Sequence, residues 1–139
     1  MKKSILLLLV LSLAPGAGAL YAESWACNYH GTWNTNGSGN SGKLEWEVTW
    51  VKQGNGWTVL GNMEDKYGAS TVNGSCQNAR CSFTQTYSTG SLVGKPYVYT
   101  GTYTDNSTGD GESENTFTGT WSGNGATGTW TARAVCTRN

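Results

Sequence analysis

The chain has 139 residues, with 9 basic and 9 acidic side chains and a charged fraction of 13%, about half the globular average. The balanced charge argues against nucleic acid and against anionic membrane surfaces as partners. The length suits a single domain, and its polar residues are mostly uncharged Gly, Thr, Ser and Asn.

The chain begins with the pattern of a secretory signal peptide. Two lysines precede an apolar run at residues 5–13, and a small-residue cleavage motif ends at Ala19. We expect residues 1–19 to be removed, with cleavage after Ala22 as the alternative. The remaining chain, residues 20–139, would be a secreted or periplasmic domain without membrane insertion, because the apolar run is shorter than the roughly 20 residues that span a bilayer.

Period-2 alternation of apolar and polar residues predicts strands along the rest of the chain. The clearest is residues 43–51, where Leu44, Trp46, Val48 and Trp50 alternate with charged residues and Thr. The expected strands are, in chain order, residues 29–34, 43–51, 57–63, 69–76 and 81–88, and three more within 96–132.

A short repeat, in which Gly and Thr precede an aromatic residue, organises these strands. It occurs at residues 29–33, 99–103, 117–121 and 126–130. In a strand, the Gly and the aromatic residues share one face and the Thr residues share the other. A Gly in mid-strand indicates a bend or a close backbone approach, which a closing barrel needs at its corners.

These patterns predict an all-β fold, a single eight-stranded antiparallel up-and-down (meander) β-barrel tied by disulfides. The Thr face is not the apolar band that a membrane barrel turns to lipid, so we expect the aromatic face inside. Four cysteines in an exported chain predict two disulfides. Of the three pairings we favour Cys76–Cys81, across a tight turn, with Cys27–Cys136 tying the ends. A zinc site is the alternative, which the Cys-x4-Cys spacing disfavours.

The opening strand, Cys27 to Trp33, resembles the Gly-x-Trp start of the calycin families (avidins and lipocalins), and residues 99–103 are similar in kind to later avidin strands. The resemblance implies a barrel with a ligand-binding mouth. Asn34 and Asn36 flank the position where the avidin pattern has its ligand-binding Asn, and the avidin tryptophan strands are not recovered. The resemblance therefore does not extend to biotin.

Inward aromatic residues are the candidate ligand-binding groups, because apolar pockets are usually lined in this way. A filled aromatic core is the favoured interpretation of these residues over a lined mouth, and Trp50 and Trp57, beside their hairpin, are the strongest candidates for a mouth. The candidates are Trp33, Trp46, Trp50, Trp57, Tyr99, Trp121 and Trp130.

Two loops offer other kinds of site. Leu92 and Val93 are expected to be exposed apolar residues in a loop flanked by Gly, with Lys95 beside them, which suits docking to a protein partner. The loop at residues 105–114 carries oxygen ligands suited to calcium, but it lacks the EF-hand register and is more simply a solvated acidic loop. Its candidate ligands are Asp105, Asp110 and Glu112.

Catalysis is the least supported function. His30, the only histidine, is expected to point outward without a nucleophile beside it. Glu45 and Glu47 share an outward face, which favours solvation over a paired-carboxylate mechanism. We therefore expect a non-enzymatic protein without a cofactor, which binds a small molecule or glycan at an aromatic-lined mouth. The alternative is an inhibitor or interaction protein that acts on a secreted hydrolase through its loops.

Overall fold

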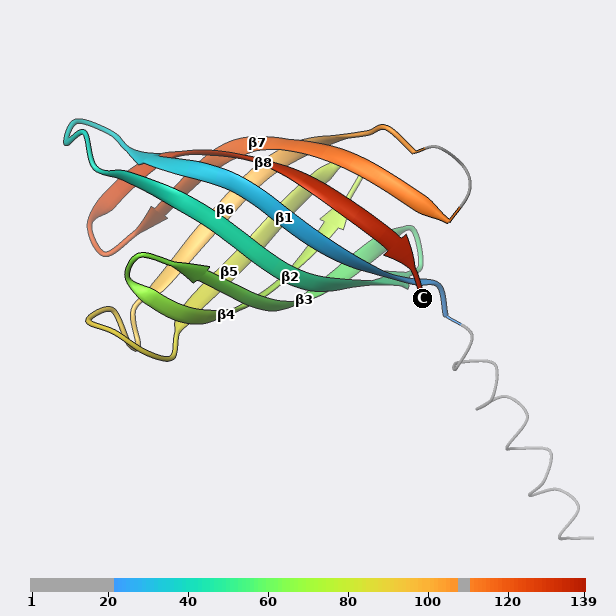
Figure 1. Ribbon diagram of the computed structural model, residues 1–139, viewed down its shortest axis with the longest axis horizontal. Helices are drawn as coiled ribbons and strands as arrows, with labels where there is room; N and C mark the ends of the chain where they lie inside the picture. The colour runs from blue at the N-terminus through green and yellow to red at the C-terminus, as the bar shows by residue number, and fades with distance from the viewer. Residues whose placement is uncertain (1–21, 108–110) are drawn as a thin grey trace, which may run out of the picture.

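A computed structural model describes residues 22–107 and 111–139 (Figure 1). The predicted signal peptide, residues 1–19, lies outside the described residues, and its cleavage stays a prediction.

Eight antiparallel strands form a closed barrel in which each strand pairs with its neighbour in sequence and β1 pairs with β8 (Figure 1). The predicted eight-stranded meander is confirmed, and the described residues contain no helix. The strands are β1 (Ser24–Thr35), β2 (Ser41–Gln53), β3 (Gly56–Asp65), β4 (Gly68–Gln77), β5 (Arg80–Tyr87), β6 (Pro96–Asp105), β7 (Glu112–Gly123) and β8 (Ala126–Arg138).

Several strands are longer than their sequence patterns predicted. β1 begins at Ser24 instead of residue 29, because it is paired on both sides, with β2 and with β8. β3 continues to Asp65 instead of ending at Met63. Since side chains alternate along a strand, this extension turns Asp65 to the same inward face as Met63.

Aromatic rings fill the middle of the barrel. We call Tyr29, Trp46, Phe83, Phe117 and Trp130 the aromatic plug, and each is at most 1% exposed. The ring centroid of Trp46 lies 4.8 Å from those of Tyr29 and Phe83 and 5.5 Å from that of Trp130. Large buried rings supply the stabilisation that aliphatic side chains provide in other cores. The plug therefore separates the two ends of the barrel interior.

The repeat glycines lie where neighbouring strands approach closely. A Cβ added at Gly119 would lie 1.9 Å from the carbonyl oxygen of Thr100. At Gly128, an added Cβ would lie 2.5 Å from Nε1 of Trp121, whose N–H donates to the carbonyl oxygen of Asn34 at 3.1 Å. The close approach expected of mid-strand Gly is confirmed, and at Gly128 it also makes room for an indole.

Both favoured disulfides are present. Cys27–Cys136 links directly paired residues of β1 and β8 across 109 positions of sequence. Cys76–Cys81 links paired residues of β4 and β5 across 5 positions. The first disulfide links the first and last strands, whose pairing closes the barrel. The second links the two strands of one hairpin. Disulfides are typical of proteins in an oxidising compartment.

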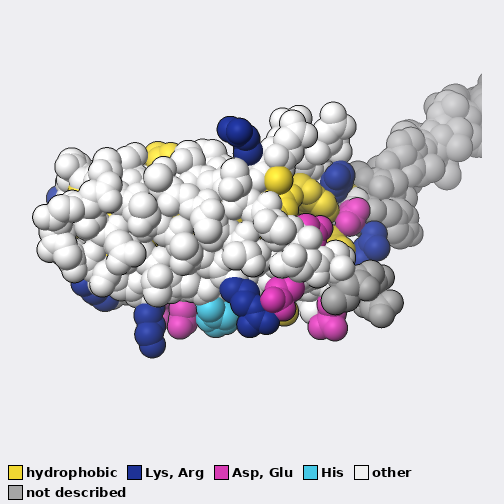
Figure 2. All heavy atoms as spheres, turned by 90° about the horizontal axis from the view of Figure 1, so that it is seen from above, with side chains coloured by type: hydrophobic (Ala, Val, Ile, Leu, Met, Phe, Trp, Pro, Cys, Tyr) yellow, Lys and Arg dark blue, Asp and Glu magenta, His cyan; other side chains and the backbone are white. Residues whose placement is uncertain are grey.

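The outer surface is largely polar and uncharged. Figure 2, a view from above Figure 1, shows a broad white face with charged side chains mainly at its margins. Thr residues contribute exposed cross-strand pairs, such as Thr100 with Thr120 and Thr118 with Thr131. Among the described residues, no helix is long and apolar enough to span a membrane.

Candidate functional site

The barrel has a cavity at each end, with the aromatic plug between them. The distal cavity lies at the end away from the C-terminus, at the left in Figure 1, where the β1–β2, β3–β4, β5–β6 and β7–β8 connections meet. Its volume is about 210 Å³. The terminal cavity lies at the opposite end and has a volume of about 140 Å³. The two cavities share no lining residue.

The distal cavity is surrounded by a chain of five rings in mutual contact. Successive ring centroids lie 5.9 Å apart for Tyr67 and Trp33, and 6.2 Å apart for Trp33 and Trp121. The chain continues from Trp121 to Tyr97 at 6.0 Å and from Tyr97 to Tyr87 at 5.8 Å. We call these five residues the aromatic ring. They come from β1, the β3–β4 turn, β5, β6 and β7, so folding of the whole barrel is needed to assemble them.

Asp65 closes the gap between the two ends of the aromatic ring. Its Oδ1 accepts the backbone N–H of Tyr67 at 2.9 Å, and its Oδ2 accepts the hydroxyl of Tyr87. The Nε2 of Gln85 also lies 3.4 Å from Oδ2. The Asp65 carboxylate is thus held among neutral donors and lines the cavity.

Buried polar groups extend inward from Asp65. Gln85 is 1% exposed, and its Nε2 donates to Oγ of Ser70 at 2.9 Å. The hydroxyl of Ser70 donates in turn to the backbone carbonyl of Met63. The Oε1 of Gln85 has no hydrogen-bond partner among the described residues. One buried acceptor on this side of the barrel is therefore left without a donor in the described part of the chain.

The outer rim of the distal cavity is held by a polar cluster. Nδ2 of Asn40 donates to the hydroxyl of Tyr67 at 2.6 Å, and Oδ1 accepts from the ammonium of Lys66 at 2.6 Å. The Lys66 Nζ lies 5.1 Å from the ring centroid of Trp33 and 5.5 Å from that of Tyr67. Both positions are within the range of cation–π attraction.

Three tyrosines of the distal cavity, Tyr87, Tyr97 and Tyr99, keep their protons at neutral pH. Burial is the main cause that raises the pKa of Tyr87, and its hydrogen bond to Asp65 raises it further. Burial also raises the pKa of Tyr97 and Tyr99, and the nearby Asp65 carboxylate adds to the effect. These phenols therefore carry no charge at neutral pH, and Asp65 is the carboxylate that lines this cavity.

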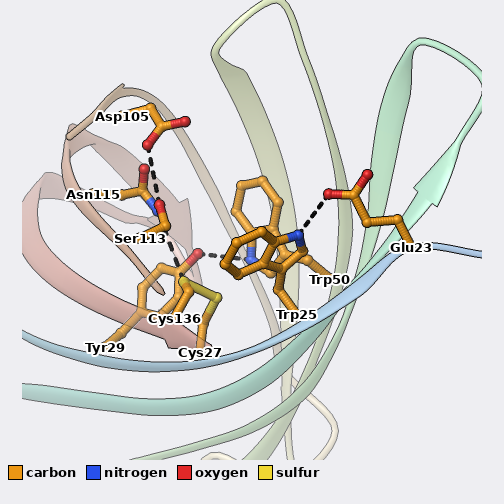
Figure 3. Close-up of a disulfide and its surroundings, with 9 residues drawn as sticks. All are labelled: Glu23, Trp25, Cys27, Tyr29, Trp50, Asp105, Ser113, Asn115 and Cys136. Atoms are coloured by element: carbon orange, nitrogen blue, oxygen red, sulfur yellow. Dashed lines mark hydrogen bonds between the residues drawn. A yellow bond between two sulfur atoms is a disulfide. The ribbon is translucent and has the colours of Figure 1, made fainter. Parts of the chain in front are cut away.

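The terminal cavity lies beside the Cys27–Cys136 disulfide (Figure 3). The indole N–H of Trp25 donates to Oε2 of Glu23 at 2.7 Å, and that of Trp50 donates to the hydroxyl of Tyr29 at 2.9 Å. These bonds fix two of the indoles that line it. Its other lining residues include Trp57, Tyr103, Asp105, Ser113 and Asn115.

The calcium hypothesis concerns the rim of the terminal cavity. Asp105 accepts a hydrogen bond from the hydroxyl of Ser113 at 3.0 Å, as Figure 3 shows. Glu112 is exposed, and Asp110 lies outside the described residues. Among the described residues, no group of three or more His, Cys, Asp or Glu side chains is arranged to hold a metal ion. The structure thus adds no support for calcium here.

The seven predicted ligand-binding aromatics are divided among three places. Trp33, Tyr99 and Trp121 line the distal cavity. Trp50 and Trp57 line the terminal cavity. Trp46 and Trp130 belong to the aromatic plug, where each is 1% exposed. The single mouth expected from the sequence is therefore two separate cavities, and the favoured pair Trp50 and Trp57 lies in the smaller one.

The loop expected to dock a protein partner is only partly exposed. Val93 is 54% exposed and Lys95 is exposed, in agreement with the expectation. Leu92, which was expected to be exposed, is half-buried and lines the distal cavity. It turns inward because the cavity offers an apolar wall to pack against. His30, Glu45 and Glu47 are exposed on the outer face, as predicted.

Sequence reasoning missed three important residues of the distal cavity. Asp65 and Tyr67 fall between the predicted strands 57–63 and 69–76, although continuing the alternation past Met63 would have placed Asp65 inward. Tyr97 lies two residues before Tyr99 in β6, so the alternation of that strand would have placed it inward as well. Alternation did place Gln85 and Tyr87 on one face of β5, but nothing in the sequence joined them to Asp65.

Comparisons with known proteins give no identification. The chain matches no protein-family model, no curated protein and no solved structure. The calycin resemblance therefore stays an expectation, and the function has to be argued from the geometry of the two cavities.

Proposed function

We propose that this protein is an exported, non-enzymatic binding protein that holds a small molecule in its distal cavity. The observation that carries the proposal is the arrangement of the five residues of the aromatic ring, with Asp65 between its two ends, around a cavity whose depth is limited by the aromatic plug. Ligand sites in proteins are usually concave and apolar, with a few polar groups that fix the orientation of the ligand. The distal cavity combines these features, and its walls are fixed by hydrogen bonds at Asp65 and Asn40.

The distal cavity supports this proposal better than the terminal one. It is the larger of the two, and it is lined by apolar and aromatic surface around one carboxylate. An eight-stranded barrel has an interior that can accommodate one small ligand. The plug limits ligand depth, so a bound molecule would contact Tyr99 at the floor and Leu92 at the side of the entrance.

A second candidate function is inhibition of, or docking to, a secreted hydrolase through the β5–β6 loop. The observation that favours it is the exposure of Val93 at 54% beside the exposed Lys95. The inward position of Leu92 counts against a docking role for that residue. Val93→Ser would weaken a protein complex and leave small-molecule binding intact, whereas Leu92→Ser would change the wall of the distal cavity.

The seven tryptophans provide a direct test of the proposal. Their indole N–H groups give separate reporters for the distal cavity (Trp33 and Trp121), the terminal cavity (Trp25, Trp50 and Trp57) and the plug (Trp46 and Trp130). We expect proton–nitrogen correlation spectra, recorded with a collection of small polar and aromatic fragments, to shift the Trp33 and Trp121 signals first. The proposal would be contradicted if only the terminal-cavity signals shifted, or if no signal shifted at millimolar concentrations of the fragments.

A further inference from the structure

We infer that the ligand of the distal cavity is a small organic cation, an alkyl or arylalkyl ammonium, and that Asp65 is its counter-ion. This inference rests on the proposed binding function and specifies its ligand class. It is carried by the juxtaposition of one carboxylate with five electron-rich rings. Cages of aromatic rings are a known means of recognising ammonium groups.

The aromatic ring presents the chemistry that a cation requires. All five members are Tyr or Trp, whose faces carry negative electrostatic potential. The molecule already shows that two of these rings accept a cation, because the Lys66 ammonium lies 5.1 Å from the Trp33 centroid and 5.5 Å from the Tyr67 centroid. Lys66 is exposed and is bonded to Asn40 and to the backbone carbonyl of Ser41, so it occupies the rim.

The charge of Asp65 lacks a cationic partner. The bonds it accepts come from Tyr67, Tyr87 and Gln85, all of them neutral donors. Among the described residues, the ion pairs involve Glu114 and Glu23, and none includes Asp65. A half-buried carboxylate is most stable when an opposite charge lies near it. A bound ammonium would supply that charge, and the low dielectric of the cavity would strengthen the attraction.

The hydrogen-bonding groups around the cavity include acceptors that a donating ligand could use. The Asn40 amide is already engaged at both its nitrogen and its oxygen. The Tyr87 hydroxyl donates to Asp65, and behind it the Gln85 Oε1 has no partner among the described residues. The Trp33 indole N–H, from a residue that lines the cavity, is also without a partner among the described residues, so the unused capacity includes a donor as well as acceptors. An ammonium donates three hydrogen bonds and accepts none, and the Asp65 carboxylate on the cavity wall is an acceptor that it can use.

The volume limits the size of the cation. A cavity of 150 Å³ accommodates benzene, so the distal cavity, at about 210 Å³, has room for a molecule of about ten non-hydrogen atoms. Phenethylammonium is of this size. Phenethyl alcohol has the same shape without the charge, and hydrocinnamate has a similar shape with the opposite charge. These three compounds separate the effect of charge from that of shape.

The experiment measures binding of the three compounds to the wild-type chain at neutral pH by calorimetry, with indole spectra to locate them. We expect phenethylammonium to shift the Trp33 and Trp121 signals and to bind about tenfold or more tightly than phenethyl alcohol, because of the added cation–π and ion-pair attraction. Hydrocinnamate should be the weakest of the three. This comparison needs no substitution, so it does not depend on a variant that folds.

Asp65→Asn removes the charge and keeps the shape of the side chain. It should reduce phenethylammonium affinity about tenfold, since a charge-assisted contact becomes a neutral one, and should leave phenethyl alcohol binding nearly unchanged. Glu64→Gln is the matched control, because Glu64 is the neighbouring carboxylate on the exposed face of β3. Its effect on either compound should be less than about twofold, as solvent screens that charge.

The outcomes separate this inference from the proposed function. Equal affinity for the cation and the alcohol at Trp33 and Trp121 would overturn the inference and leave the binding function standing. An unchanged preference for the cation in Asp65→Asn would overturn the role of Asp65. Failure of all three compounds to shift these signals would overturn the ligand class, and if the fragment collection also failed to shift them, the proposed function would fall as well.

Discussion

The hydroxyl of Tyr87 on β5 donates a hydrogen bond to the carboxylate of Asp65 at the end of β3, across the intervening strand β4. We predict that Tyr87→Phe lowers the free energy of unfolding by about 1–2 kcal/mol, because a partly buried carboxylate loses one of its donors. Urea unfolding monitored by tryptophan fluorescence measures this. Tyr103→Phe is the control, since the Tyr103 hydroxyl makes no protein hydrogen bond in the described part of the chain; an equal loss in both variants would contradict the assignment.

The barrel should lose stability in alkaline solution. Burial raises the pKa of Tyr29, Tyr87, Tyr97, Tyr99 and Tyr103. In the unfolded chain these phenols ionise at about pH 10, whereas in the folded chain they keep their protons to higher pH. Above that pH the unfolded state binds fewer protons, so the free energy of unfolding falls as pH rises.

Urea midpoints measured on both sides of pH 10, together with tyrosinate absorbance, would test this behaviour. The prediction requires the phenols to ionise as the barrel unfolds. If these buried tyrosines ionised in the folded barrel without loss of structure, the explanation would be wrong.

The two disulfides should contribute unequally. In the chain-entropy model, the loop closed by Cys27–Cys136, with a separation of 109, is worth about 4–5 kcal/mol, and that closed by Cys76–Cys81, with a separation of 5, about 2 kcal/mol. We therefore expect the double Ser variant of the first pair to be the less stable one. Thermal unfolding of the two double variants measures the difference, and the reverse order would contradict the entropic account.

A glycine in place of Ala79 in the β4–β5 turn should raise the free energy of unfolding. Ala79 has a φ of 63° and follows Asn78, with a φ of 55°, a conformation that L-residues other than Asn and Asp rarely adopt. Two-residue hairpin turns of this kind favour Asn-Gly. Ala79→Gly should stabilise the protein by about 1 kcal/mol, since it relieves this strain. Ser75→Gly, on the exposed face of β4, is the control and should destabilise; a loss of stability in both would refute the prediction.

Much of the fold follows from alternation along the strands. The inward position of Trp33, Trp46 and Trp130 and the pairing of Cys27 with Cys136 were both predictable, because a closed meander fixes which side chains face inward and which strands meet. The depth of each ring along the barrel axis was not predictable, since it depends on strand stagger. Trp46 therefore proved to be part of the plug, although its sequence pattern is the same as that of Trp50.

The candidate site was less predictable than the fold. Asp65 lies at the last position of β3, where period-2 alternation gives way to the turn, and its inward orientation depends on pairing with Gly68. Leu92 lies in an irregular loop whose path is set by the cavity beside it. The position of Leu92 thus depends on tertiary contacts, about which local sequence carries little information, whereas that of Asp65 depends on how far the strand continues into its turn.

A ligand held in the distal cavity is the central prediction for this protein. Native mass spectrometry of the chain purified from its own source, followed by the same measurement after denaturation, tests this. We predict a small adduct that is lost on denaturation, retained in Trp57→Ala at the terminal cavity, and absent from Trp121→Ala, which opens the wall of the distal cavity. A bare polypeptide in the wild type, or an adduct retained in Trp121→Ala and lost in Trp57→Ala, would contradict the account.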